Sequence, residues 1–221
     1  MRCLFSFGGM YVADRSYLTI RAGAEAEYVD RRSRFIAAIE PVTDEESALA
    51  FIAARKKKYW DARHNVHAYV LRNGISRFSD DGEPQGTAGL PMLETLQKRG
   101  LTDCVVVVTR YFGGILLGTG GLVRAYSQST SLAVDAAGVV ECRPCMVGTV
   151  TCDYAQYGRI APLVAECGGR VTDTAFAEAV TLTALLPVEL VEGFVRELTE
   201  VSAGTLNFCQ IEEIFEFFEK S

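Results

Sequence analysis

The segment that most constrains the fold is 103–131, which reads DCVVVVTRYFGGILLGTGGLVRAYSQSTS. Its run Val105–Val108 is β-branched and unbroken, which is typical of a strand buried on both faces. Five glycines follow, and after them an apolar stripe at helical spacing predicts a helix over 122–137. The segment therefore predicts a buried strand, a glycine-rich turn and a helix whose start is itself rich in glycine.

This arrangement is suited to binding an anion. Glycine lets the backbone approach a ligand closely, and the first turn of a helix presents unpaired amides at the positive end of its dipole. Flanking arginines would add charge-assisted hydrogen bonds. The spacing matches neither the Walker motif nor the dinucleotide fingerprint, so the alternative that these glycines serve only close packing stays open. The predicted anion-binding residues are Arg110, Gly113, Gly114, Gly118, Thr119, Gly120, Gly121 and Arg124.

Composition sets broad limits on the kind of protein. The chain has 221 residues, of which 49% are hydrophobic and 23% charged, so it can hold one large domain or two small ones and is not a disordered polymer. No apolar run approaches the ~20 residues needed to cross a bilayer, and residues 1–10 do not resemble a signal peptide. Translation could start at Met1 or Met10.

The seven cysteines are odd in number and scattered, which indicates reduced thiols and a cytoplasmic protein. Cys142 and Cys145 have CxxC spacing, which also occurs in zinc and redox sites. Zinc would need a second ligand pair, and His64 and His67 lie far away in the sequence. We therefore expect a thiol-bearing linker here and no cofactor.

Charge is unevenly distributed along the chain, whose net charge is −6. Residues 1–140 contain 17 Lys and Arg against 15 Asp and Glu, whereas residues 141–221 contain 5 against 13. This asymmetry favours two domains. Because an acidic surface repels phosphate, we expect RNA or the ribosome to bind the first half, and a protein partner to bind the acidic second half.

The first 138 residues predict a mixed α+β domain. Helical spacing, an Asn-Gly hairpin signal at 73–74 and short apolar runs give the order β-β-α-β-β-α-β-α. The predicted ranges, in that order, are 17–20, 34–39, 43–58, 65–72, 75–79, 91–99, 105–108 and 122–137. The first two strands are expected to pair with each other in an antiparallel arrangement.

Two basic segments border this predicted sheet. The cluster at 31–35 is either a solvated strand edge or part of a binding face. The run at 55–58 either suits the C-terminal dipole of its helix or forms a nucleic-acid patch with the neighbouring Tyr59 and Trp60. The positive rim predicted for a binding surface consists of Arg34, Arg63, Lys56, Lys57 and Lys58.

An acidic turn, SDDGEP at 79–84, follows the hairpin. Carboxylates this close together can hold Mg²⁺ or act as an acid–base pair, and a histidine at the start of the preceding strand could serve as a general base. The structural alternative is that these are ordinary turn residues and a structural histidine. The catalytic candidates are His64, Asp80, Asp81 and Glu83, with no metal expected.

The second half has its own order, β-α-β-β-α-β, which is that of the ferredoxin-like fold. The ranges 146–152, 154–167, 170–176, 179–186, 189–201 and 205–211 predict these elements. We expect domains at 16–138 and 146–213, a linker at 139–145, and tails at 1–15 and 214–221. No catalytic constellation is apparent in this half, and its apolar tail is expected to dock on folded protein or in an oligomer.

The motifs of the first half together resemble the YigZ/IMPACT family. They are Ser33-Arg34-Phe35, Asp61-Ala62-Arg63-His64, FSDDGEP at 78–84 with GTAG at 86–89, and RYFGG at 110–114 with LGTGGLVRAY at 117–126. They occur in the order of the family, and the resemblance covers about 17–211. The second half suits the bacterial YigZ branch.

The resemblance implies an N-terminal ribosomal protein S5 domain 2-like domain and a C-terminal ferredoxin-like domain similar to the last domain of elongation factor G. It implies a role in translation: the eukaryotic relatives regulate initiation through a protein partner, and nucleic-acid or ribosome binding has been proposed for the bacterial branch by fold analogy. We therefore predict a binding protein without a cofactor. The alternative is a hydrolase or phosphotransferase that uses His64 and the acidic turn.

Overall fold

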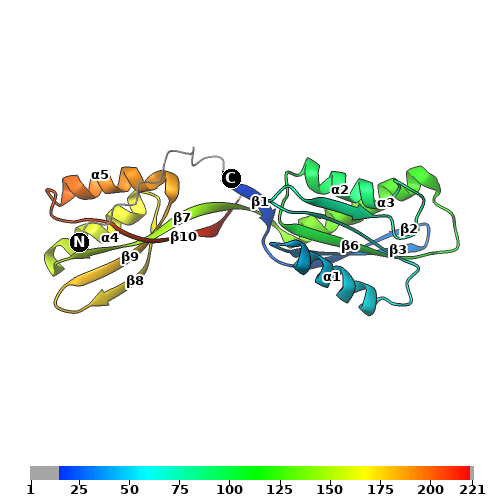
Figure 1. Ribbon diagram of the computed structural model, residues 1–221, viewed down its shortest axis with the longest axis horizontal. Coiled ribbons are helices and arrows are strands. Elements are labelled where there is room, and N and C mark those ends of the chain that lie inside the picture. The colour runs from blue at the N-terminus through cyan, green and yellow to red at the C-terminus, as the bar shows by residue number, and fades with distance from the viewer. Residues whose placement is uncertain (1–14, 220–221) are drawn as a thin grey trace. The chain divides into compact units, whose positions relative to one another are not determined.

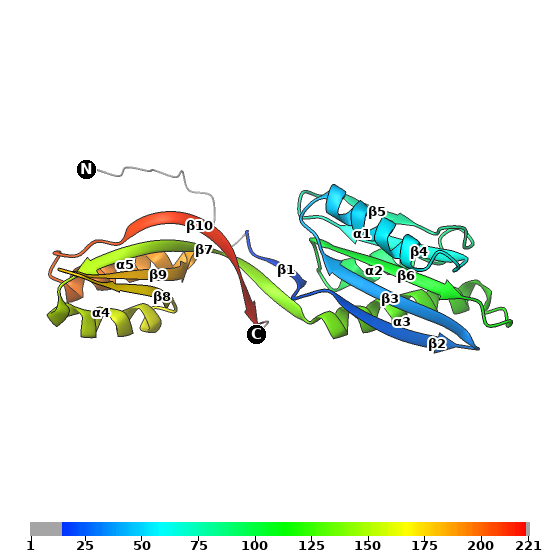
Figure 2. The same ribbon diagram turned by 90° about the horizontal axis from the view of Figure 1, so that it is seen from below.

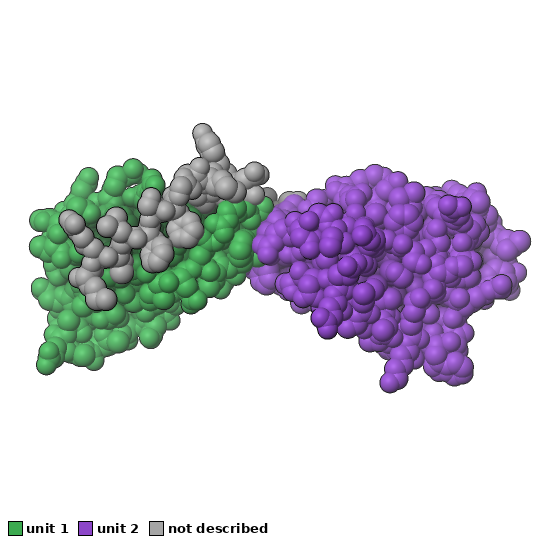
Figure 3. Space-filling model, in the orientation of Figure 1, with its two compact units in different colours: residues 1–16, 142–216 green, residues 17–141, 217–221 purple. Residues whose placement is uncertain are grey.

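The computed structural model describes residues 15–219. They divide into an N-terminal unit, 17–141 with 217–219, and a C-terminal unit, 15–16 with 142–216 (Figure 3). Both units combine helices with antiparallel strand pairs, which confirms the α+β fold class. None of the helices in this part of the chain has the length and apolar character needed to cross a membrane.

The N-terminal unit is built on a five-stranded sheet of order β2-β3-β6-β4-β5 (Figure 2). Its strands are β2 (Ala24–Asp30), β3 (Ser33–Pro41), β4 (His64–Val70), β5 (Ser76–Ser79) and β6 (Cys104–Tyr111). Every neighbouring pair is antiparallel. The sheet places β6 at its centre, as the unbroken valine run predicts.

Helices cover both faces of this sheet (Figure 1). On one face α2 (Gly89–Lys98) and α3 (Gly118–Ala137) pack on Val106 and Val108, and on the other α1 (Glu45–Lys58) packs on Val105 and Val107. Because successive side chains of a strand point to opposite faces, all four valines are fully buried. The prediction that β6 is buried on both faces is confirmed.

Strand β2 is the element that the sequence did not indicate. It alternates small and charged residues (AEAEYVD), a pattern that also describes a solvated loop. Its turn into β3 uses Arg31 and Arg32 at φ +45° and +68°, with neither Gly nor Asn to mark it. The predicted pairing of 17–20 with 34–39 is wrong, because β3 pairs with β2 and β6 whereas β1 (Tyr17–Ile20) pairs with β7 (Val139–Cys152).

The C-terminal unit has a sheet in which β10 (Cys209–Glu219) pairs with β7, followed by β9 (Val180–Pro187) and β8 (Arg170–Phe176). Helices α4 (Tyr154–Glu166) and α5 (Val191–Val201) enclose one core with this sheet, and a short 3-10 helix, Val188–Leu190, precedes α5. The elements follow the predicted order β-α-β-β-α-β.

Two predicted segments differ from their expected form. Residues 139–145, expected as a linker, form the first half of β7, and the boundary between the units falls within that strand. Residues 214–219, expected as a tail, belong to β10. The alternative start Met10 lies outside the described residues.

Candidate functional site

Most of the predicted site residues gather at one end of the N-terminal sheet. Strand pairing places Arg110 of β6 opposite His64 of β4 on one side and Phe35 of β3 on the other. The acidic turn closes over the same end, where the His64 Nδ1 atom lies 2.8 Å from the carbonyl oxygen of Asp81. The catalytic candidates of the acidic turn and of β4 therefore meet Arg110 at this end of the sheet.

Asp80 has a structural role in this turn. Its carboxylate accepts backbone N–H groups from Gly86, Ala88 and Gly89 at 2.8, 3.1 and 2.8 Å. These amides belong to the entry and the first turn of α2, which has no side-chain cap of its own. Asp80 therefore caps the N-terminus of α2.

Asp81 is held by two elements. One carboxylate oxygen accepts a hydrogen bond from Lys56 Nζ of α1 at 2.8 Å, and the other accepts the Asn65 N–H at 2.7 Å. Burial tends to raise the pKa of Asp81, but the bonds from Lys56 and Asn65 outweigh it and leave this pKa below its usual range. The carboxylate is therefore ionised and committed to fixing the turn.

Glu83 and Arg110 form a buried ion pair. The Arg110 Nη1 donates to Glu83 Oε1 at 2.6 Å, and the hydroxyl of Tyr126 on α3 donates to the same oxygen at 2.8 Å. The side chains of Arg110 and Glu83 are only 8% and 3% exposed. The Arg110 guanidinium also lies 5.5 Å from the centre of the Phe35 ring. The expectation that Arg110 presents its charge to a ligand is corrected: the guanidinium neutralises a carboxylate of the acidic turn.

His67 is the other histidine of β4, and its Nδ1 is buried without a hydrogen-bond partner. Burial lowers its pKa, and the nearby Lys56 ammonium lowers it further. The folded protein therefore resists protonation of His67, whereas the unfolded chain takes up a proton near pH ~6.5.

The sign of this shift gives a pH prediction. The stability that neutral His67 contributes is present above pH ~6.5 and is lost as the pH falls toward the lowered folded-state pKa. Urea titrations followed by far-ultraviolet circular dichroism should show a lower free energy of unfolding at about pH 5 than at about pH 7. The variant His67→Gln should show a smaller fall, and an unchanged fall in this variant would contradict the assignment.

The glycine-rich loop and the start of α3 are open to solvent. Gly118 and Gly120 are exposed, and a side chain added at either position would meet nothing within 4 Å. The N-cap residue Leu117 provides no capping side chain, so no side chain of the described residues caps the first amides of the helix. Arg124, one turn later, is exposed and forms no ion pair or hydrogen bond with any described residue. The start of α3 is therefore accessible to a ligand.

The loop residues differ in role. Gly113 serves close packing, which was the alternative to anion binding. Its backbone touches that of Arg32 in the β2–β3 turn, and its N–H donates to Ser33 Oγ at 3.1 Å. Gly114 is exposed, with open space where a side chain would be. Between the glycines, Ile115 and Leu116 are 42% and 81% exposed. The loop therefore presents an apolar tip beside helix amides that no described side chain caps.

The predicted basic rim is partly neutralised. Three members are paired, Arg34 with Glu27 and Lys56 with Asp81 at 2.8 Å each, and Lys58 with Glu25 at 3.5 Å. The other two, Arg63 and Lys57, are exposed and form no ion pair with any described residue.

The structure contains a cavity on the α1 side of the sheet that the sequence patterns did not predict. Its volume is about 490 Å³, and we call it the β2–β3 cavity. It is lined by Glu25, Ala26, Glu27, Arg34, Ile36, Tyr59, Asp61 and Tyr111. Strand β2 carries three of these residues. Because the sequence did not predict β2, it did not predict the cavity either.

Among the described residues, the cysteines are neither disulfide-bonded nor part of a metal-ligand cluster. The six between residues 15 and 219 are free thiols, and Cys142 and Cys145 are buried in β7. Burial raises the pKa of Cys145 to about 11, which opposes formation of the reactive thiolate. Within the described residues, no three His, Cys, Asp or Glu side chains lie together as metal ligands do.

Comparison with known proteins gives consistent matches. Residues 31–134 match the Impact N-terminal domain, and residues 150–205 match a domain of unknown function (DUF1949). The chain is 40% identical to IMPACT family member YvyE of Bacillus subtilis over 191 residues, which are 86% of this chain and 88% of that protein. It is 37% identical to IMPACT family member YigZ of Escherichia coli over 187 residues, 83% and 92% of the two chains.

More distant and structural matches agree. Protein IMPACT of Xenopus laevis is 40% identical over 96 residues, which are 40% of this chain and 30% of that protein. A solved structure described as "Crystal structure of an hypothetical protein" is similar at 36% identity with a TM-score of 0.57, and the match covers 89% of this chain and 98% of the other.

Proposed function

Because the chain belongs to the IMPACT family, we propose that it is a cytoplasmic, translation-associated binding protein whose N-terminal unit binds RNA phosphates, in free RNA or in the ribosome, at the start of α3. The observation that carries this proposal is the open start of α3. Two glycines there have open space where a side chain would be, the first-turn amides lack a capping side chain, and Arg124 pairs with none of the residues described. Such a helix start favours negative charge.

The surroundings of α3 support phosphate as the ligand. Arg31 and Arg32 are exposed at the β2–β3 turn, whose backbone touches Gly113 of the loop. This turn adjoins the loop that leads into α3, so these two arginines and Arg124 are available to one extended polyanion. Phe112, 51% exposed at the start of the loop, offers a ring on which a base can stack.

The topology supports the finer fold assignment that we propose. Strand order β10-β7-β9-β8 in the C-terminal unit corresponds to the order of a ferredoxin-like sheet, and we propose the S5 domain 2-like class for the N-terminal unit. We further propose that the acidic C-terminal unit contacts a protein, since its charge disfavours RNA.

The enzyme alternative has less support. Asp80 binds three backbone amides, and Glu83 is buried in an ion pair with Arg110. Neither carboxylate is placed to receive a proton from a substrate. Asp81 is likewise held by Lys56 and the Asn65 N–H, so a hydrolase or phosphotransferase would have to act through His64 alone.

A salt series tests the proposal. Binding of a short single-stranded RNA should weaken steeply between about 50 and 200 mM salt, and Arg124→Ala should reduce the slope of log K against log salt by about 0.7–1. The matched control is Arg99→Ala. Arg99 pairs with Asp135 of α3. Asp135 lies 17 residues after Gly118, which places it about 25 Å from the start of the helix. Arg99→Ala should therefore leave the slope unaltered. No binding by wild type, or equal effects of both changes, would refute the proposal.

A further inference from the structure

We propose that the β2–β3 cavity is a second binding site, which takes a ligand through an amine or guanidinium group. Its volume of about 490 Å³ lies within the range of ~300–1,000 Å³ that is usual for small-molecule sites. Two tyrosine rings, three carboxylates and one guanidinium line it. The choice of ligand follows from which of these charges are already paired.

The cations at the cavity are all engaged. Arg34 donates Nε and Nη2 to the two carboxylate oxygens of Glu27, at 2.9 and 2.8 Å. Arg55 Nη1 donates to Glu25 Oε2 at 2.6 Å, and Lys58 lies 3.5 Å from the same oxygen. Hydrogen bonds from these cations hold the pKa values of Glu25 and Glu27 below their usual range, against the opposing effect of burial. An incoming anion would therefore meet ionised carboxylates and, among the described residues that line the cavity, no unpaired cation.

Asp61 is the carboxylate left for a ligand. It accepts a hydrogen bond from the Tyr111 hydroxyl at 2.8 Å and pairs with no cation of the described residues. This bond raises the pKa of Tyr111, so the hydroxyl stays protonated and keeps the carboxylate oriented. A cationic group placed beside Asp61 would gain a charge-assisted hydrogen bond.

The tyrosine rings favour the same kind of ligand. The Tyr59 ring already attracts Arg55 and Lys58, whose charged atoms lie 4.7 and 5.0 Å from its centre. Tyr59 and Tyr111 together form the aromatic part of the lining. Ring faces that attract cations, next to a carboxylate without a cation, are suited to ammonium or guanidinium groups.

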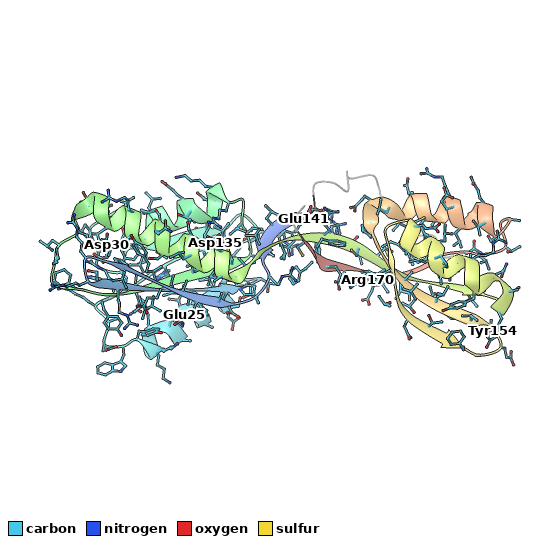
Figure 4. All side chains as sticks on the ribbon, turned by 180° about the vertical axis from the view of Figure 1, so that it is seen from behind. Glu25, Asp30, Asp135, Glu141, Tyr154 and Arg170 are labelled. Atoms are coloured by element: carbon cyan, nitrogen blue, oxygen red, sulfur yellow. The ribbon has the colours of Figure 1, made fainter. Side chains whose placement is uncertain are left out.

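This cavity is separate from the start of α3. Tyr111 and Arg110 are neighbours on β6 and point to opposite faces of the sheet, so the cavity lies on the α1 side. Figure 4 shows Glu25 on this side and Asp135 on α3, across the sheet. The two sites can therefore be tested independently.

The single tryptophan, Trp60, lies between Tyr59 and Asp61 in the sequence and serves as a fluorescence reporter. We would titrate the full-length protein with agmatine and, separately, with an end-blocked tripeptide that contains one arginine. At least one should bind saturably. Asp61→Asn should weaken this binding about tenfold or more, as should Tyr111→Leu, whereas Tyr111→Phe should retain more of it because the ring remains. The charge-matched control, Asp135→Asn, should have little effect.

The outcomes separate the two sources of the cation. Saturable agmatine binding supports a free amine as the ligand, and binding of the tripeptide alone supports a side chain of a protein partner. The proposal is overturned if neither probe saturates, if Asp61→Asn binds as well as wild type, or if propionate competes as effectively as the cations. Asp61 is exposed, so far-ultraviolet circular dichroism of Asp61→Asn should match that of wild type.

Discussion

Glu83→Gln is expected to lower the free energy of unfolding of the N-terminal unit by about 3–5 kcal/mol. The change removes the negative charge but keeps the shape, so the Arg110 guanidinium stays buried without a counter-charge. The Tyr126 hydroxyl loses its charged acceptor as well. Urea titration followed by far-ultraviolet circular dichroism measures the effect, because Trp60 is 83% exposed in the folded protein and its environment changes little on unfolding.

Two variants control this experiment. Glu94→Gln makes the same chemical change in an exposed ion pair with Lys98, and it should cost less than about 0.5 kcal/mol. The double variant Glu83→Met with Arg110→Met removes both charges, and it should cost less than the sum of its single variants because no buried charge is left alone. A loss below about 1 kcal/mol for Glu83→Gln would show that the pair does not stabilise this end of the sheet.

Gly113→Ala is expected to destabilise the N-terminal unit by about 3 kcal/mol, the upper end of the range for overpacking. A methyl group at this position would lie 2.1 Å from the carbonyl carbon of Arg32 and 2.3 Å from the backbone nitrogen of Ser33. These are backbone atoms of a turn, so they cannot move aside as a flexible side chain would. The loop would have to separate from the β2–β3 turn.

The matched control for Gly113→Ala is Gly120→Ala, seven residues along the same segment. A methyl group at Gly120 meets nothing within 4 Å, and alanine is the better helix former. Gly120→Ala should therefore leave stability unchanged or raise it by up to about 1 kcal/mol. Equal losses in both variants, measured by the same urea titration, would show that Gly113 has no special packing role.

Much of the fold could be predicted from local patterns. The valine run identified β6, and Asn-Gly identified the β4–β5 hairpin, because each signal depends only on neighbouring residues. Strand β2 was missed because its identity depends on a distant partner. Glu25 and Glu27 give it a polar character, and their charges are satisfied by Arg55 and Arg34 only in the folded chain.

The sequence could predict which residues form the candidate site, but not which of them pair with each other. The sequence indicated Arg110, Glu83 and the glycines as important, yet Arg110 and Glu83 are 27 positions apart and nothing local shows that they neutralise each other. Sequence therefore assigned Arg110 to a ligand and Glu83 to catalysis. A helix after the glycines was predicted, but its start was placed at Leu122 and lies at Gly118, because the glycines at 118, 120 and 121 are poor helix formers that local spacing does not assign to a helix.

Amide chemical shifts of the ¹⁵N-labelled full-length protein, recorded during titration with a short single-stranded RNA, test the central claim most directly. If phosphate binds the start of α3, the amide signals of Gly118, Thr119 and Gly120 should move progressively and saturate together. The contradictory result is RNA binding in which these signals stay fixed while signals of the C-terminal unit move.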